Sequence, residues 1–218
     1  MPCMEEIARA GNLVLRQRED GSLELRANGV FVMDTAETST EVALATRALE
    51  LHHSPASVLI GGLGLGFTLG AVLAEDRVAR VTVVEIEQAL VGWMRDGTVP
   101  FGPPLLADPR VEVHVADVAL YLQLAGPSSY DLVLLDVDNG PGYLVHDVNA
   151  GLYTAPALEQ ARRVTRPGGT VVVWSAAEAP ELEAAMQEVF GRWRVEALPF
   201  AVDLQGREET YWLYAGHI

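Results

Sequence analysis

The sequence is poor in cysteine and in basic residues, and both shortages exclude classes of function. Cys3 is the only cysteine, so the chain can form no internal disulfide and no cysteine-based zinc site. The 218 residues include 15 basic and 30 acidic side chains, which give a net charge of -15. Such a charge repels nucleic-acid phosphates and anionic lipid surfaces. We therefore predict that neither nucleic acids nor membranes are partners.

Long hydrophobic runs are also missing. No uninterrupted apolar segment approaches the roughly 20 residues that a membrane-spanning helix needs. The first twelve residues, MPCMEEIARAGN, carry acids where a secretory signal carries bases, and no apolar stretch follows them. We therefore expect a cytoplasmic protein.

The first 38 residues predict a small N-terminal β-meander. Residues 12–35 are rich in alternating apolar and polar positions, interrupted by the turn dipeptides Asp20-Gly21 and Asn28-Gly29. From Ser39 to Leu51 the apolar residues recur at helical spacing, which predicts a helix. We expect one domain over residues 1–38 and a second over residues 39–218.

The second domain alternates short apolar runs with helical segments, as in a parallel sheet. The runs are SVLIGG, RVTVVEI, VEVHVAD, YDLVLLD and TVVVWSA. Strands that are apolar on both faces and separated by helices belong to a sheet covered on both sides. A helix is expected from Ala155 to Val164, and the final runs RVEALPF and TYWLYAG predict an antiparallel hairpin at the sheet edge. The pattern predicts a doubly wound, Rossmann-like α/β fold.

A glycine-rich turn follows the first of these strands, at Gly61, Gly62, Gly64 and Gly66. In doubly wound sheets ligands bind at the carboxyl ends of the strands, where glycines let the backbone approach them. The dinucleotide pattern G-x-G-x-x-G fails, because Phe67 occupies the sixth position counted from Gly62. The remaining G-x-G-x-G spacing is typical of turns that bind S-adenosylmethionine and related nucleosides. A tight turn without a ligand is the alternative.

Acidic residues end the next three strands. Glu85 lies nineteen residues after Gly66, near the separation expected for a carboxylate that accepts from ribose hydroxyls. Asp117 could accept from an adenine amino group, although either acid could instead cap a helix. Asp136 follows the fourth strand, in the run DVDNGPG, and acids at this edge face the ligand cleft.

In the segments described above the chain resembles the spermidine synthase family of polyamine aminopropyltransferases. The matching segments are VLIGGLGLG, VTVVEIE, DPRVEVHVAD, YDLVLLDVDNGP and LYTAPALEQARRVTRPGGTVVVW. The resemblance implies an S-adenosylmethionine-dependent transferase fold, decarboxylated S-adenosylmethionine as donor, a small-molecule amine as acceptor, and a homodimer. It implies that the nucleoside is bound by Gly61, Gly62, Gly64, Gly66, Glu85, Asp117 and Asp136. It makes Asp136 the base.

The remaining loop residues are assigned to the amine. Asp138 is expected to assist Asp136 in catalysis, and Asp138, Asn139 and Tyr143 are expected to bind the substrate. His146 and Tyr153 lie close by and could line the same pocket, although packing alone would also explain them. No metal site is predicted.

The chain departs from the family pattern at substrate-binding positions. Gly64 stands where the family has the aspartate that binds the ammonium group of the donor, and Asn139 replaces an acid. Ser39, Thr40 and Glu41 replace the Tyr-His-Glu of the first long helix. Two alternatives to aminopropyl transfer therefore stay open. One is a methyltransferase that uses intact S-adenosylmethionine on an unidentified small molecule, and the other is a non-catalytic nucleoside-binding protein.

Overall fold

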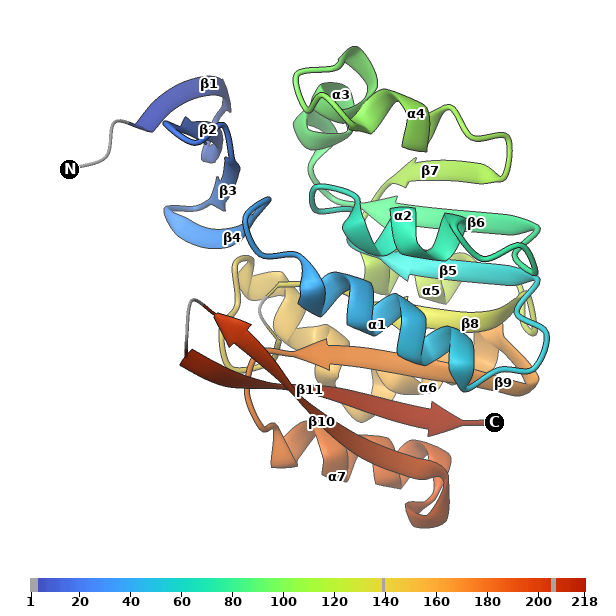
Figure 1. Ribbon diagram of the computed structural model, residues 1–218. Coiled ribbons are helices and arrows are strands. Elements are labelled where there is room, and N and C mark those ends of the chain that lie inside the picture. Colours follow the sequence, from blue (N-terminus) through green and yellow to red (C-terminus); the bar gives the residue numbers. More distant parts are fainter. Residues whose placement is uncertain (1–3, 139, 205–206) are drawn as a thin grey trace.

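The N-terminal segment forms an antiparallel sheet of its own. The structure is a computed structural model that describes residues 4–138, 140–204 and 207–218. Its first four strands pair in chain order and are β1 (Met4–Ala10), β2 (Leu13–Arg18), β3 (Leu23–Ala27) and β4 (Val30–Asp34) (Figure 1). Asn28 and Gly29 join β3 to β4 with positive φ angles of 53° and 78°, as a tight hairpin turn requires. The predicted meander is confirmed.

The second sheet has seven strands in the order β10-β11-β9-β8-β5-β6-β7. Five strands are parallel, namely β5 (Ser57–Gly61), β6 (Arg80–Glu85), β7 (Val111–Val115), β8 (Tyr130–Leu135) and β9 (Thr165–Ser175). The last two, β10 (Val195–Leu204) and β11 (Arg207–His217), form an antiparallel hairpin that pairs with β9. The doubly wound α/β fold and its edge hairpin are confirmed. The strand order reverses around β5, which lies between β6 and β8.

Helices cover both faces of this sheet. They are α1 (Ser39–Glu50), α2 (Phe67–Leu73), α3 (Gln88–Asp96), α4 (Gly102–Leu106), α5 (Val118–Leu124), α6 (Ala155–Val164) and α7 (Pro180–Phe190), with short 3-10 helices η1 (Asp147–Tyr153) and η2 (Arg192–Arg194). In β5, Val58 and Ile60 pack in the cluster that includes α1 to α3, whereas Leu59 packs in the cluster with α5 to α7. Alternate residues of one strand therefore enter two cores, which explains why the strand is apolar throughout.

The meander packs over one end of the main sheet. Leu13, Leu25 and Met33 belong to the same buried cluster as Leu63 and Leu65 of the glycine turn. The division at residue 38 stays a prediction.

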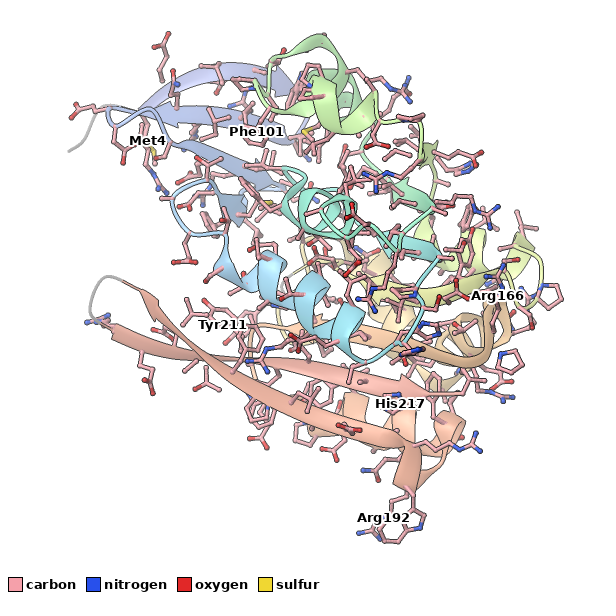
Figure 2. The ribbon with its side chains drawn as sticks, turned by 45° about the vertical axis from the view of Figure 1, so that its right-hand side comes forward. Met4, Phe101, Arg166, Arg192, Tyr211 and His217 are labelled. Atoms are coloured by element: carbon pink, nitrogen blue, oxygen red, sulfur yellow. The ribbon has the colours of Figure 1, made fainter. Side chains whose placement is uncertain are left out.

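The edge hairpin packs near α1. There Tyr211 of β11, labelled in Figure 2, stacks on Trp174 with ring centres 5.8 Å apart. Across the described residues no helix is long and apolar enough to cross a membrane.

Candidate functional site

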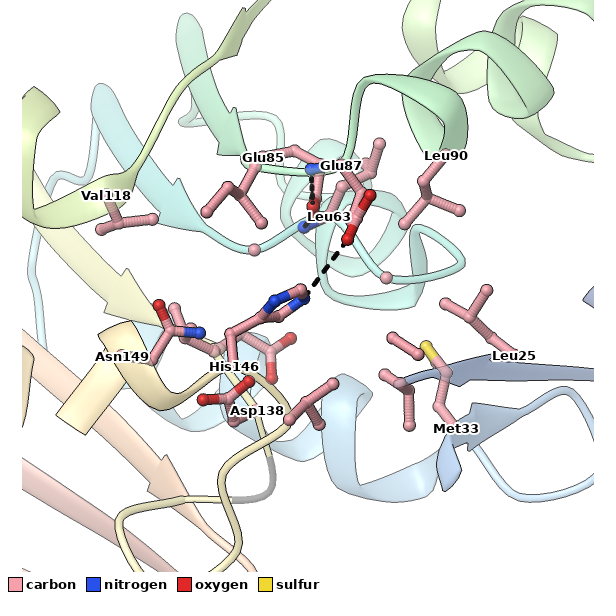
Figure 3. A pocket seen from close by; sticks show the side chains of 18 of the residues that line it. Leu25, Met33, Leu63, Glu85, Glu87, Leu90, Val118, Asp138, His146 and Asn149 are labelled. Carbon is pink, nitrogen blue, oxygen red and sulfur yellow. Dashed lines mark hydrogen bonds and ion pairs between the residues drawn. The ribbon is translucent and has the colours of Figure 1, made fainter. Parts of the chain in front are cut away.

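A pocket opens at the carboxyl ends of β5, β6 and β8, where the strand order reverses. Figure 3 shows that side chains from the glycine turn, from the segments after β6 and β8, and from the meander surround it. Ligands of open α/β sheets bind at this kind of reversal. The lining includes Gly62, Gly64, Glu85, Asp136 and Asp138, so the structure brings together five residues that the sequence assigned to the site.

The glycine turn has a backbone that side chains would prevent. Gly62 has a φ angle of 94°, and a Cβ atom there would lie 2.1 Å from the carbonyl oxygen of Asp136. Its N–H donates to the carbonyl oxygen of Val84. Gly61 and Gly66 do not line the pocket. A Cβ on either would meet a neighbouring side chain at 2.9 Å or less, so these two glycines let the turn pack closely.

Glu85 holds the glycine turn in place. Its carboxylate accepts the N–H of Leu63 at 2.8 Å and the N–H of Glu87 at 2.7 Å, one on each oxygen. The residue is 7% exposed, and its burial raises the pKa of the carboxyl against the lowering effect of these two bonds. Because each carboxylate oxygen has a second lone pair, Glu85 can still accept from a ligand hydroxyl.

Two other predicted ligands, Asp117 and Tyr143, are not among the residues that line the pocket. Asp117 is the N-cap of α5, where its side chain accepts the N–H of Leu120, and it is absent from the lining. The structure therefore shows the capping role that was the alternative for this acid. Tyr143 is 62% exposed and is also absent from the lining. Asn139 lies outside the described residues. The assigned roles of all three stay predictions.

Asp136 lies directly after β8 and faces the pocket. The hydroxyl of Thr68 on α2 donates to its Oδ2 atom at 2.6 Å. Burial raises the pKa of Asp136 to about 6, although the bond from Thr68 lowers it. A carboxyl with this pKa is ionised at neutral pH and can still accept a proton, which suits a general base.

Glu41 is a second acid at this point, and the sequence argument gave it no role. It lies in the first turn of α1 and lines the pocket. Burial, followed by the charge of Asp136, raises its pKa to about 7. The Thr68 hydroxyl also lies 3.4 Å from the carbonyl oxygen of Glu41, so one side chain contacts both acidic residues. The signal in the sequence was its position at the glutamate of the family's Tyr-His-Glu.

Asp138 organises the loop that follows β8. It has a positive φ angle of 56°, and its side chain accepts hydrogen bonds from the Asn149 side chain and from the N–H groups of Val145 and His146. Burial raises its pKa, and these bonds oppose the rise. Its Oδ2 atom is buried without a hydrogen-bond partner among the described residues. Asp138 therefore shapes the pocket whether or not it also binds an amine.

The pocket carries far more negative than positive groups. Five acids line it, namely Glu41, Glu85, Glu87, Asp136 and Asp138, against one histidine. His146 places its Nε2 atom 3.4 Å from the Oε1 atom of Glu87, a contact drawn as a dashed line in Figure 3. The sequence contains no lysine, and no arginine is among the described lining residues. Such a site attracts cations.

The opposite wall is apolar and comes from the meander. Leu13, Leu25, Ala27, Val32 and Met33 supply it. The sequence argument treated the meander as a separate domain and placed no site residue in it.

In residues 4–138, 140–204 and 207–218 no group of three His, Cys, Asp or Glu side chains could hold a metal ion.

Comparisons with known proteins identify the family of the chain. A family model described as the spermine/spermidine synthase domain matches residues 37–192. Polyamine aminopropyltransferase 2 of Pseudomonas aeruginosa is 36% identical over 134 residues, which cover 60% of this chain and 36% of that protein. Putrescine N-methyltransferase 3 of Nicotiana tabacum is 31% identical over 154 residues, covering 70% of this chain and 36% of that protein. The chain thus matches little more than a third of the length of either relative.

Solved structures show the same fold. A spermidine synthase in complex with the transition state analogue AdoDATO superposes with a TM-score of 0.79 at 17% identity, covering 96% of this chain and 72% of that one. A probable spermidine synthase from Corynebacterium glutamicum superposes with a TM-score of 0.69 at 21% identity, covering 100% of this chain and 80% of the other.

Proposed function

Because the chain belongs to the spermine/spermidine synthase family, we propose that it transfers an aminopropyl group from decarboxylated S-adenosylmethionine to an amine acceptor. The observation that carries this proposal is the chemistry of the pocket. A glycine turn lies beside acids with raised pKa values, and no arginine is found among the described lining residues. Both substrates are cations, since the donor has a sulfonium group and the acceptor an ammonium group. An acidic pocket fits both.

The residues for the nucleoside lie on the glycine-turn side. We assign Glu85 to accept from the ribose hydroxyls and the backbone at Gly62 and Gly64 to contact the nucleoside, since all three residues line the pocket. Gly61 and Gly66 keep the turn in its shape. We also assign Asp117 to the adenine end, and a test of that role is whether Asp117→Asn, which can still cap α5, weakens nucleoside binding.

The residues for the reaction lie around Asp136. When bound, the sulfonium supplies a carbon already activated for displacement, so the protein needs no nucleophile of its own. The acceptor amine has a solution pKa near 10.4, the value of lysine, and must lose a proton before it attacks. We assign Asp136 to hold the ammonium and accept that proton, and its raised pKa supports this role. The amine nitrogen then bonds to the carbon, the carbon–sulfur bond breaks, and its electron pair stays on sulfur as a thioether.

The amine's remaining contacts are assigned to the loop after β8. Asp138, Asn139 and Tyr143 are proposed to bind the part of the acceptor that does not react. Glu41 adds a second negative charge beside Asp136, which favours an acceptor with more than one ammonium group.

Methyl transfer is the second candidate, and one observation favours it. Gly64 offers no negative charge to repel the carboxylate that intact S-adenosylmethionine carries and its decarboxylated form lacks. The relatives of this chain also include putrescine N-methyltransferases. Such an enzyme would use intact S-adenosylmethionine and move only its methyl group. The same base, Asp136, would serve either reaction.

Calorimetric titration with S-adenosylmethionine, its decarboxylated form and methylthioadenosine separates the candidates. Preference for the decarboxylated form supports aminopropyl transfer, and the mass of the product formed from putrescine then identifies the group moved. Preference for intact S-adenosylmethionine supports methyl transfer. Failure of all three to bind refutes both enzyme proposals and the non-catalytic nucleoside-binding alternative with them.

We expect a homodimer, as the family resemblance implies, and a cytoplasmic location, where both small-molecule substrates would be available. Sedimentation velocity over a range of protein concentrations tests the first, and a monomer at every concentration would contradict it.

A further inference from the structure

Four residues that line the pocket form one row across the carboxyl edge of the main sheet. In each of four neighbouring strands, the row residue directly follows the last residue that pairs in line with the other three strands. The row, in the order of the strands β9, β8, β5 and β6, is Trp174, Asp136, Gly62 and Glu85. Since neighbouring strands lie about 4.8 Å apart, it spans about 14 Å.

The order of this row sets the direction in which the acceptor lies. The residues assigned to the nucleoside, Glu85 and Gly62, occupy one end, and the assigned base Asp136 comes next. In a displacement the amine approaches the reacting carbon from the side opposite to the sulfur, so donor and acceptor lie in line. The rest of the acceptor therefore extends away from Glu85, past Asp136 and toward Trp174.

Trp174 gives the pocket an aromatic surface at that end. The residue is 8% exposed, and Tyr211 stacks on it with an angle of 24° between the ring planes, which holds the indole in place. Its Nε1 atom is buried and has no hydrogen-bond partner in the part of the chain that the structure describes. The pocket therefore meets the ring carbons of Trp174 and not its N–H group. The π-face of an indole attracts cations.

Glu41 brings a carboxylate to the same end of the row. It lies in the first turn of α1, the helix that contacts β8, β9 and β11, and it lines the pocket. Burial raises the pKa of Tyr211, and the charges of Glu209, Glu37 and Glu41 raise it further. The carboxylate of Glu41 thus lies near the aromatic pair that Tyr211 forms with Trp174.

We propose that Trp174 and Glu41 form a subsite for the ammonium group of the acceptor that does not react. The carboxylate pairs with this ammonium, and the indole covers the adjoining carbon chain and one side of the cation. The inference rests on the proposed function, because the place of the donor sets the direction of the acceptor. It adds a second wall to the contacts assigned to the loop after β8.

Two amines test the subsite without requiring turnover. Putrescine and butylamine have the same carbon chain and differ only in the second ammonium group. In calorimetric titration of the complex with methylthioadenosine, we expect wild-type protein to bind putrescine about tenfold or more tightly than butylamine. Glu41→Gln keeps the shape of the side chain without its charge, and it should bring the ratio of the two dissociation constants to within about threefold.

Trp174 is tested by removing and by keeping an aromatic ring. Trp174→Leu loses the contact between the ring and the cation and should lower the ratio about fivefold or more, whereas Trp174→Phe should lower it by less than about threefold. Trp193→Leu is the matched control, because it makes the same change at a side chain that is 94% exposed and absent from the pocket lining. It should leave the ratio unchanged. Cooperative thermal unfolding shows that each variant folds, and Trp174→Met replaces Trp174→Leu if the latter does not.

The outcomes separate this inference from the function on which it rests. If wild-type protein binds both amines equally, no second ammonium group is recognised, and the inference is refuted while the proposed function stands. A preference for putrescine that stays at its wild-type size in Glu41→Gln or in Trp174→Leu refutes the subsite as well, because the second ammonium is then held elsewhere. If methylthioadenosine does not bind, or neither amine binds to its complex, the proposed function fails too.

Discussion

Replacing Thr68 by valine removes the hydrogen bond that its hydroxyl donates to Asp136 Oδ2 at 2.6 Å. Bonds to a charged acceptor contribute about 1.5–3 kcal/mol, and one pKa unit corresponds to about 1.4 kcal/mol. The bond favours the carboxylate, so its loss raises the pKa of Asp136 from about 6 by about one to two units. In a plot of kcat/KM against pH, the acidic limb should therefore shift to higher pH by the same one to two units, about the change in the pKa of Asp136. Thr68→Ser keeps the hydroxyl and is the control.

Stability gives a second measurement that does not depend on turnover. Asp136 has a higher pKa in the folded chain, about 6, than its ordinary value of 3.8, so the folded state binds more protons in that interval. Ionisation therefore destabilises the fold as the pH rises through it, by up to about 3 kcal/mol. Because the Thr68 bond offsets part of this penalty only when Asp136 is charged, Thr68→Val should lose more unfolding free energy near pH 8 than near pH 4 in urea titrations. Equal losses at the two pH values would refute the reasoning.

Three further substitutions test other parts of the site. Asp136→Asn should abolish turnover. It should also raise the unfolding free energy near pH 8 by up to about 3 kcal/mol, because the buried charge is gone. A variant that keeps full activity would show that Asp136 is not the base. Glu85→Gln leaves one of its two N–H partners, on Leu63 or Glu87, facing an amide NH2, and should lower the unfolding free energy by about 1–3 kcal/mol and weaken nucleoside binding in calorimetry. Gly62→Ala should destabilise by several kcal/mol in urea titrations, because its Cβ would lie 2.1 Å from a backbone oxygen, whereas Gly142→Ala, with nothing within 4 Å, should change stability by less than about 0.5 kcal/mol.

The parts of the fold that depend on local pattern were predictable from the sequence. The helix expected from Ala155 to Val164 is α6, with the same ends. Apolar runs predicted buried strands because alternate residues such as Leu59 and Ile60 enter two different cores. Glu85 and Asp136 were placed correctly at the pocket because the carboxyl ends of neighbouring parallel strands meet at one edge.

The parts of the site that depend on packing between distant segments were not predictable. Glu41 faces Asp136 because α1 packs on α2, where Thr68 contacts both residues, and no local pattern encodes that approach. Met33 reaches the glycine turn through the pairing of β3 with β4, whose register shifts between Leu25 and Arg26. A one-residue change in register moves a side chain to the other face of a sheet, so the sequence alone could not assign Met33 to the pocket.

The origin of the apolar wall has a consequence for how members of the family could diversify. The family model matches from residue 37 onward, whereas Leu13, Leu25 and Met33 precede that point. The acids proposed for the chemistry and the apolar wall opposite them thus come from different stretches of chain. Exchanging the first 36 residues between relatives would then change the apolar wall of the pocket while the acids at the sheet edge keep their places, and a library of such chimeras would sample pocket shapes.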